Sequence, residues 1–179
     1  MFKTHSIKIL LISIFTLFLN GMAGAEVINT SGKYYETTED IRVKVMGGFL
    51  TVERTWINGQ WYFNRHWGRL GIIRNLDDNN IKEISRNDNI YLKVDDQGKL
   101  FRFGKRKTIA VTETGFRWQD RKGNWIKYDR EGYMKSYGDR NNVTVTLQYD
   151  DQNRLTGAMD HFGQQMLWFD YNPQNQLIE

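Results

Sequence analysis

The sequence has no cysteine and only one proline among its 179 residues. The absence of cysteine excludes disulfides and a lipid anchor attached through a thiol, so packing and hydrogen bonds must stabilise the fold. The single proline, the many Gly, Asn and Asp residues and the hydrophobic alternation over short runs together indicate an all-β chain.

The sequence also has little net charge and no motif of a common enzyme class. Without residues 1–25 the formal net charge falls from +4 to +2, because Lys3 and Lys8 are removed and no acid is. Such a balance gives no electrostatic footprint for nucleic acid, so we expect no nucleic-acid partner. The short cluster Lys105-Arg106-Lys107 is interpreted as a solvated loop rather than a phosphate site. Beyond residue 25 only His66 and His161 remain, and neither lies in a Gly-x-Ser-x-Gly or His-Glu-x-x-His motif. We therefore expect no catalytic residues, no cofactor and no metal site.

The start of the chain is typical of a secretory signal peptide. Residues 1–8 are basic, residues 9–19 are apolar, and Ala23-Gly24-Ala25 places small residues where a signal peptidase cleaves. The apolar run is short for a membrane span. We predict a signal peptide over residues 1–25 and a secreted, periplasmic or cell-surface protein without a transmembrane segment after cleavage. An uncleaved anchor is the alternative, and a linker over residues 26–37 is expected to follow.

One phrase occurs three times in the last third of the chain. Each copy has an aromatic residue, an acid or amide, two turn residues, Gly or Asn, a variable residue and an apolar one. The copies start at Tyr128, Tyr149 and Tyr171. A second phrase starts at Asp139 and again at Asp160. A period of about twenty residues predicts a repeated supersecondary unit that must stack on its neighbours to form a core.

The stretches between these phrases alternate between apolar and polar residues, as half-buried strands do. The predicted fold is all-β, with consecutive antiparallel hairpins forming a curved, open β-strip. Its inner face is expected to hold Val145, Leu147, Leu167 and Phe169, and its other face Thr144, Thr146 and Gln148. Further hairpin turns are predicted at Gly47-Gly48, Asn58-Gly59, Asp95–Gly98 and Arg121–Gly123.

The residues of the repeat are expected to be structural. A tyrosine at a strand end packs broadly while its hydroxyl stays in water, and an aspartate beside it accepts hydrogen bonds from the turn backbone. The Asp-rich turns lack the glycine and terminal glutamate of a dedicated calcium loop. The repeat residues are Tyr128, Asp129, Gly132, Asp139, Tyr149, Asp150, Asp160, Gly163 and Tyr171.

These phrases resemble the Rhs and YD-repeat proteins of bacterial secreted polymorphic toxins. The resemblance covers roughly residues 38–177, with an opening segment at 38–110 and a YD-repeat strip at 111–179. It rests on the three tyrosine phrases, Asp160-x-x-Gly163, residues 114–125, and an opening pattern in which Asp40-Ile41-x-Val43 precedes Gly47-Gly48 and Val52-x-Arg54-x-Trp56. It implies a β-strip that spirals into a hollow shell around a toxic C-terminal domain. With three clear repeats and no toxin segment, this sequence is similar to the N-terminal piece of such a shell, whether as a gene remnant, a truncated product or a small stand-alone relative.

Two functions follow as hypotheses. The first is a secreted, non-enzymatic structural piece that associates with itself or with other YD-repeat chains through its C-terminal β-edge, residues 171–178. The alternative is a carbohydrate-binding module in which exposed aromatic side chains stack on cell-wall or surface polysaccharide. Its main candidates are Trp56, Trp61 and Trp67, and further ones are Tyr62, Trp118, Trp125 and Trp168.

Overall fold

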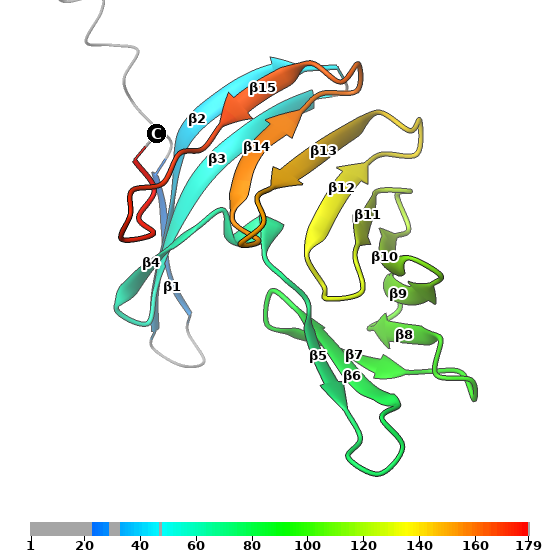
Figure 1. Cartoon of the computed structure of the whole chain (residues 1–179). Coiled ribbons are helices and arrows are strands. Elements are labelled where there is room, and N and C mark those ends of the chain that lie inside the picture. The colour runs from blue at the N-terminus through cyan, green and yellow to red at the C-terminus, as the bar shows by residue number, and fades with distance from the viewer. Residues whose placement is uncertain (1–22, 29–32, 47, 179) are drawn as a thin grey trace, which may run out of the picture. The chain divides into compact units, whose positions relative to one another are not determined.

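The computed structural model describes residues 23–28, 33–46 and 48–178. The described chain consists of β-strands and one short 3-10 helix, η2 (Arg65–Trp67), so the prediction of an all-β fold is confirmed. The described residues form two compact units, one made of those up to residue 42 together with 51–64, and the other of those within 43–50 together with 65–178. Figure 1 shows the strands in their two antiparallel sheets.

The smaller sheet has four strands in the order β1-β2-β3-β4. They are β1 (Ala23–Ile28), β2 (Lys33–Val45), β3 (Gly48–Ile57) and β4 (Gln60–Phe63). The structure therefore differs from the linker predicted at residues 26–37, because β1 pairs with β2 from Ala23↔Thr38 to Ile28↔Lys33. This segment has no apolar alternation, but its Tyr and Thr residues favour strands. The predicted signal peptide lies outside the described residues except for residues 23–25, which belong to β1.

The larger sheet has eleven strands, and their spatial order from β15 to β5 is the reverse of the chain order with no crossover. Consecutive antiparallel hairpins in an open sheet are thus confirmed. The strands are β5 (Gly71–Arg74), β6 (Ile81–Arg86), β7 (Asn89–Lys93), β8 (Leu100–Phe103), β9 (Lys107–Thr112), β10 (Gly115–Asp120), β11 (Trp125–Tyr128), β12 (Met134–Gly138), β13 (Thr144–Tyr149), β14 (Leu155–Met159) and β15 (Gln165–Trp168).

Three predicted hairpin turns are confirmed. Asn58 and Gly59 both have positive φ, 53° and 84°, as a two-residue turn between β3 and β4 requires. Residues 95–98 join β7 to β8, and residues 121–123 join β10 to β11. The turn predicted at residues 47–48 falls between β2 and β3, and Gly47 lies outside the described residues.

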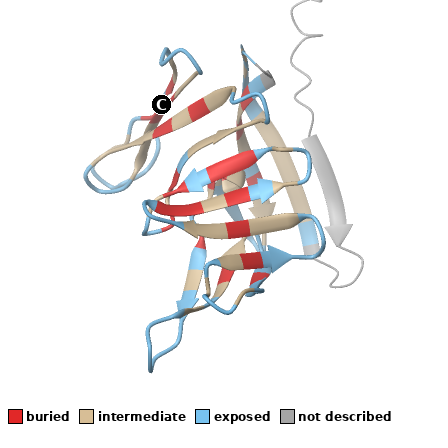
Figure 2. Ribbon diagram, turned by 90° about the vertical axis from the view of Figure 1, so that its right-hand side faces the viewer, coloured by how far each residue is buried: buried red, intermediate tan, exposed pale blue. Residues whose placement is uncertain are grey.

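The core of the larger sheet lies on one face, as alternation predicts. Val145, Leu147, Leu167 and Phe169 are buried, whereas residues 144, 146 and 148 are partly exposed. Figure 2 shows buried residues on successive strands of this sheet. The inner row runs directly across β8 to β13 through cross-strand partners: Phe101, Ile109, Trp118, Ile126, Tyr137 and Val145. All of these side chains except the partly exposed Tyr137 are buried, and removing their apolar surface from water stabilises this part of the sheet.

The larger sheet also bends. Side chains from strands that are not adjacent in it form hydrogen bonds with one another, which a flat sheet would not allow. The Trp118 indole N–H on β10 donates to the Tyr91 hydroxyl on β7 at 2.8 Å. The Arg86 Nε–H on β6 donates to the Tyr128 hydroxyl on β11 at 2.7 Å. These bonds place β6 and β7 against the inner face of β10 and β11.

Candidate functional site: the repeat junctions

Seven turns in the described residues share one geometry, and they include every predicted repeat turn. Six connect strands of the larger sheet, and the seventh follows β15 and is closed by the bridge between Tyr171 and Leu177. The first residue of each turn is Asp or Asn, and the residue three positions later donates its backbone N–H to the first residue's carbonyl. That later residue always has positive φ. In a three-residue hairpin loop this residue occupies the left-handed region, where Gly and Asn are best tolerated. The first residues are Asp95, Asp120, Asp129, Asp139, Asp150, Asp160 and Asn172.

The first side chain of each turn accepts backbone hydrogen bonds. At Asp150, one carboxylate oxygen accepts the N–H groups of Gln152 and Arg154, both at 2.9 Å. The corresponding oxygen of Asp160 accepts N–H groups from residues 162 and 164, also at 2.9 Å. The Asp side chain therefore closes the turn, which agrees with the structural role predicted from the sequence.

The tyrosine of each repeat stands across the hairpin from the apolar residue six positions later. Tyr128 pairs with Met134, Tyr149 with Leu155, and Tyr171 with residue 177. In these three repeats the turn begins directly after the tyrosine, and its last residue, the one with positive φ, stands two positions before the apolar residue.

The tyrosine hydroxyls join successive repeats. Tyr149 donates to the Met134 carbonyl at 2.8 Å, and Tyr171 donates to the Leu155 carbonyl at 2.9 Å. In both cases the acceptor is the apolar residue that ends the preceding repeat. The expectation that these hydroxyls stay in water is thus wrong, because a strand end in this sheet lies beside the previous hairpin. Tyr128 has no such preceding repeat, and its hydroxyl accepts from Arg86 instead.

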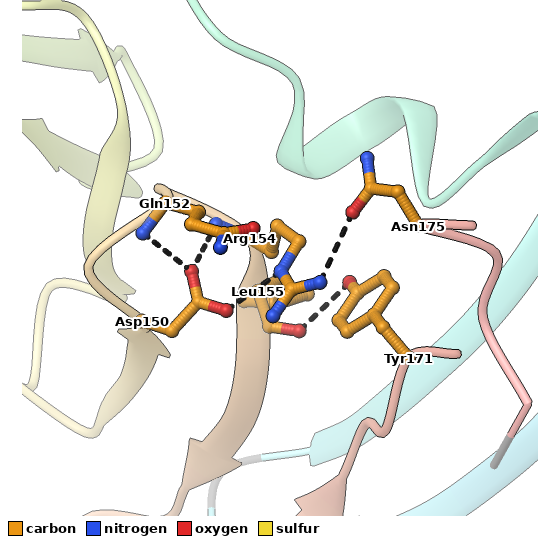
Figure 3. A network of polar contacts seen from close by, with 6 residues as sticks. All are labelled: Asp150, Gln152, Arg154, Leu155, Tyr171 and Asn175. Atoms are coloured by element: carbon orange, nitrogen blue, oxygen red, sulfur yellow. Dashed lines mark hydrogen bonds and ion pairs between the residues drawn. The ribbon is translucent and has the colours of Figure 1, made fainter. Parts of the chain in front are cut away.

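A cation completes each contact between successive repeats. We call this arrangement a repeat junction: the tyrosine, the backbone carbonyl that its hydroxyl bonds, the aspartate of the preceding turn, and the cation that contacts both the aspartate and the tyrosine ring. At the second junction the Arg154 Nε–H donates to Asp150 Oδ2 at 2.7 Å, while the guanidinium lies 4.9 Å from the centre of the Tyr171 ring. Figure 3 shows this junction, in which Arg154 also reaches Asn175 Oδ1 at 3.2 Å. At the first junction Lys135 lies 4.0 Å from Asp129 and 4.7 Å from the Tyr149 ring.

The local environment shifts the proton affinities of the junction groups. Hydrogen bonds to the carboxylate, first that from the Arg154 N–H, hold the pKa of Asp150 below its ordinary value. Burial raises the pKa of the Tyr149 hydroxyl well above 10, and burial raises that of Tyr171 as well. At neutral pH the aspartate is therefore charged and the tyrosines are neutral, the forms that their hydrogen bonds require.

The cations of the junctions could not be located from the sequence. Lys135 and Arg154 occupy different positions of the repeat, so no fixed spacing links them to the following tyrosine. A basic residue just after each turn was the only available signal, and basic residues are common at such positions.

The tryptophans proposed to bind carbohydrate do not form one site. Trp67 is only 6% exposed, so its prediction as a stacking residue is wrong; it packs edge-on against Phe169 with ring centres 6.3 Å apart. Trp118 and Trp125 are buried too, the latter with its indole N–H bonded to the Asp139 carbonyl at 2.9 Å. Trp168 is 64% exposed on β15.

Two of the three main candidates do form a surface on the four-stranded sheet. Trp56 and Trp61 are cross-strand partners whose rings meet edge-on at 5.4 Å, and Trp61 is 45% exposed. The Arg54 guanidinium lies 5.4 Å from the Trp61 ring and donates two hydrogen bonds to Asp40, at 2.7 and 2.8 Å. We call Asp40, Arg54, Trp56 and Trp61 the aromatic platform. Tyr62 is 37% exposed, but it follows Trp61 on β4 and pairs with Thr55, so its side chain lies on the opposite face of the sheet.

Within the described residues, no cluster of three or more His, Asp or Glu side chains is arranged so that it could hold a metal ion. Residues 23–28, 33–46 and 48–178 also contain no helix long and apolar enough to cross a bilayer.

Neither a scan against protein-family models nor a search of curated proteins finds a match for this chain. The repeat junctions and the aromatic platform are therefore the observations on which a function can be proposed.

Proposed function

We propose that this protein is a non-enzymatic YD-repeat β-strip, a structural piece of an Rhs-type shell that acts outside the cytoplasm. The observation that carries this proposal is the repeat junction. Its Asp closes its own turn, its Tyr hydroxyl bonds to the preceding hairpin, and its cation contacts both, which is the behaviour of a scaffold rather than of a reacting group. Asp150, for example, uses both carboxylate oxygens inside the junction.

The last described repeat presents the groups that a further repeat would need. Leu177 pairs with Tyr171 as Met134 and Leu155 pair with their own tyrosines. Its carbonyl occupies the place of the acceptors used by Tyr149 and Tyr171. β15 is also the outermost strand on this side of the larger sheet in the described residues. We therefore propose that another YD-repeat chain, or a second copy of this one, adds its strands here.

Sedimentation analysis over a range of protein concentrations tests this proposal. The wild type is expected to self-associate, and Trp168→Lys is expected to weaken association by placing a charge on the outermost strand. Phe162→Lys is the matched control, because Phe162 is 72% exposed but lies in the turn before that strand. A strictly monomeric wild type, or equal weakening by both substitutions, would contradict assembly at this edge.

The aromatic platform supports carbohydrate binding as a second candidate function. An exposed indole face suits the apolar face of a sugar ring, and the paired Arg54 and Asp40 offer polar groups for sugar hydroxyls beside it. The platform lies on the four-stranded sheet, so this function does not depend on the repeat junctions.

Retention on insoluble cell-wall polysaccharide tests the platform. Trp61→Ala is expected to reduce retention, while Trp168→Ala, which removes an exposed tryptophan elsewhere, is expected to leave it unchanged. Trp67→Ala is unsuitable as a probe because the side chain is buried. If wild type and both folded variants are washed off alike, the platform does not bind the polysaccharide.

A further inference from the structure

The outer face of β8 to β10 carries a hollow of about 380 Å³ with an unusual excess of positive charge. Its volume falls within the range of about 300–1,000 Å³ typical of ligand sites. Four cations line it: Arg102, Lys105, Arg106 and Arg121. We call it the basic hollow.

The fold assembles these cations from separate parts of the sequence. Phe101, Ile109 and Trp118 point into the core, so their neighbours point outward in a row. Arg102 on β8 stands opposite Thr108 on β9, which in turn stands opposite Gln119 on β10.

Two turns then supply the remaining cations. Lys105 and Arg106 lie in the turn between β8 and β9, and Arg121 lies in the turn between β10 and β11. Of the cluster at residues 105–107, interpreted from sequence as a solvated loop, residues 105 and 106 thus belong to a larger cationic surface, while Lys107 begins β9.

The positive charges of the basic hollow are only partly offset by the residues that line it. None of its four cations forms an ion pair or a hydrogen bond with any residue that the structure describes. One carboxylate, that of Asp120, also lines the hollow. It is engaged in its own turn, where it accepts the Lys122 N–H at 2.8 Å, the Asn124 N–H at 3.0 Å and the Asn124 side-chain amide at 2.9 Å.

Four neighbouring cations and a single carboxylate leave a net positive charge in the hollow, so the cations repel one another and a bound anion relieves this repulsion. Three of the four are arginines, whose planar groups donate paired hydrogen bonds to phosphate oxygens. Thr108 and Gln119 add a neutral hydroxyl and amide on the floor of the same hollow. This combination suits a phosphate group joined to a polar carrier.

We infer that the basic hollow binds phosphate groups, either of a free polyphosphate or of a phosphodiester glycopolymer at the cell surface. This site is separate from the aromatic platform and from the repeat junctions. It would give the β-strip a ligand of its own, independent of any assembly at β15.

Isothermal titration calorimetry of the full chain tests the inference with two probes, inorganic tripolyphosphate and poly(glycerol phosphate). The experiment is run in 150 mM NaCl, where screening over about 8 Å suppresses diffuse attraction. The wild type is expected to bind at least one probe saturably. The double variant Arg102→Gln, Arg121→Gln is expected to bind at least about tenfold more weakly, because each lost charge-assisted hydrogen bond is worth roughly that factor.

The matched control is the double variant Lys82→Gln, Lys93→Gln. It removes the same charge from a second hollow, of about 200 Å³, in which both lysines stand beside Asp78 and Asp96. Binding within about twofold of wild type is expected for it. Equal weakening of both variants, or a wild type that binds neither probe, would overturn the inference. A preference between the probes identifies the source of the phosphate.

Discussion

At the residue scale, tyrosine recurs in the repeat because its hydroxyl reaches a backbone carbonyl that no aliphatic side chain could satisfy. Tyr149→Phe removes one such bond and leaves the Met134 carbonyl without its donor. We expect the free energy of unfolding to fall by about 1 kcal/mol, the usual net value of a buried hydrogen bond. Urea denaturation measures it. Tyr133→Phe is the control, since the Tyr133 hydroxyl makes no hydrogen bond within the described residues.

The aspartate at the first position of the turn should make the stability of the fold depend on pH under acidic conditions. The pKa of Asp150 is lower in the folded chain than its ordinary 3.8, chiefly because the carboxylate accepts the Arg154 N–H. Such a group stabilises the fold above the unfolded pKa and loses that effect as the pH falls through the folded pKa. Asp150→Asn should therefore be less stable than wild type at pH 7, and the difference should shrink below about pH 4.

Denaturation series at several pH values check this expectation. The exposed neighbour Asp151 has no partner in the described residues, so Asp151→Asn should show no comparable pH-dependent difference from wild type. A constant gap between Asp150→Asn and wild type from pH 7 to pH 2 would mean that the charge of Asp150 does not matter.

At the element scale, the repeated turn needs positive φ at one position but not a glycine as such. Gly163 has φ 79°, and a Cβ added there would meet nothing within 4 Å. Asn142, Asn153 and Asn175 occupy the same position of other turns with φ near 60°. Gly163→Ala should therefore cost about 1 kcal/mol from backbone strain alone, whereas Gly163→Asn should cost a few tenths. Thermal unfolding of both variants compares them, and equal losses would refute a purely conformational requirement.

The strands and turns of this protein were largely predictable, because the signals that specify them lie within short stretches of the sequence. Alternation in residues 143–149 identifies the buried face because a strand exposes every second side chain, and turn signals such as Asn58-Gly59 fix where strands end. Trp67 could not be placed in this way. It lies in the 3-10 helix η2, where no period of two applies, and its burial depends on Phe169, a hundred residues away in the sequence.

The candidate sites were less predictable than the elements. The tyrosines and aspartates were found because they repeat, but their partners Lys135 and Arg154 do not keep a fixed spacing. The basic hollow was missed because Arg102 and Arg121 join residues 105 and 106 only after β8 and β10 take their places on either side of β9. Which residues become neighbours across strands depends on the pairing register. Turn signals in the sequence specify that register within one hairpin, but not between residues that lie on successive hairpins.

At the scale of the whole molecule, the repeats should be interchangeable units. Deleting residues 129–149 joins Tyr128 directly to Asp150 and so restores the same phrase at the new junction. We expect this shortened chain to keep a cooperative unfolding transition, since each repeat pairs with its sequence neighbours.

A deletion of residues 129–148 provides the control. It leaves one extra tyrosine at the junction and exchanges the faces of every following strand relative to the preceding ones. Circular dichroism melting should show a lower or less cooperative transition for this variant. Similar melting of the two deletions would show that the phase of the repeat does not govern the fold.

The uninterrupted strand order of the larger sheet also determines how the protein should respond to mechanical force. A sheet whose spatial order follows the chain can be peeled from one end, breaking one hairpin's hydrogen bonds at a time instead of shearing many together. Pulling on the β15 end should therefore extend the chain at low force in steps of one hairpin. The contact between Trp67 and Phe169 would act as the first latch, since Phe169 directly follows the outermost strand.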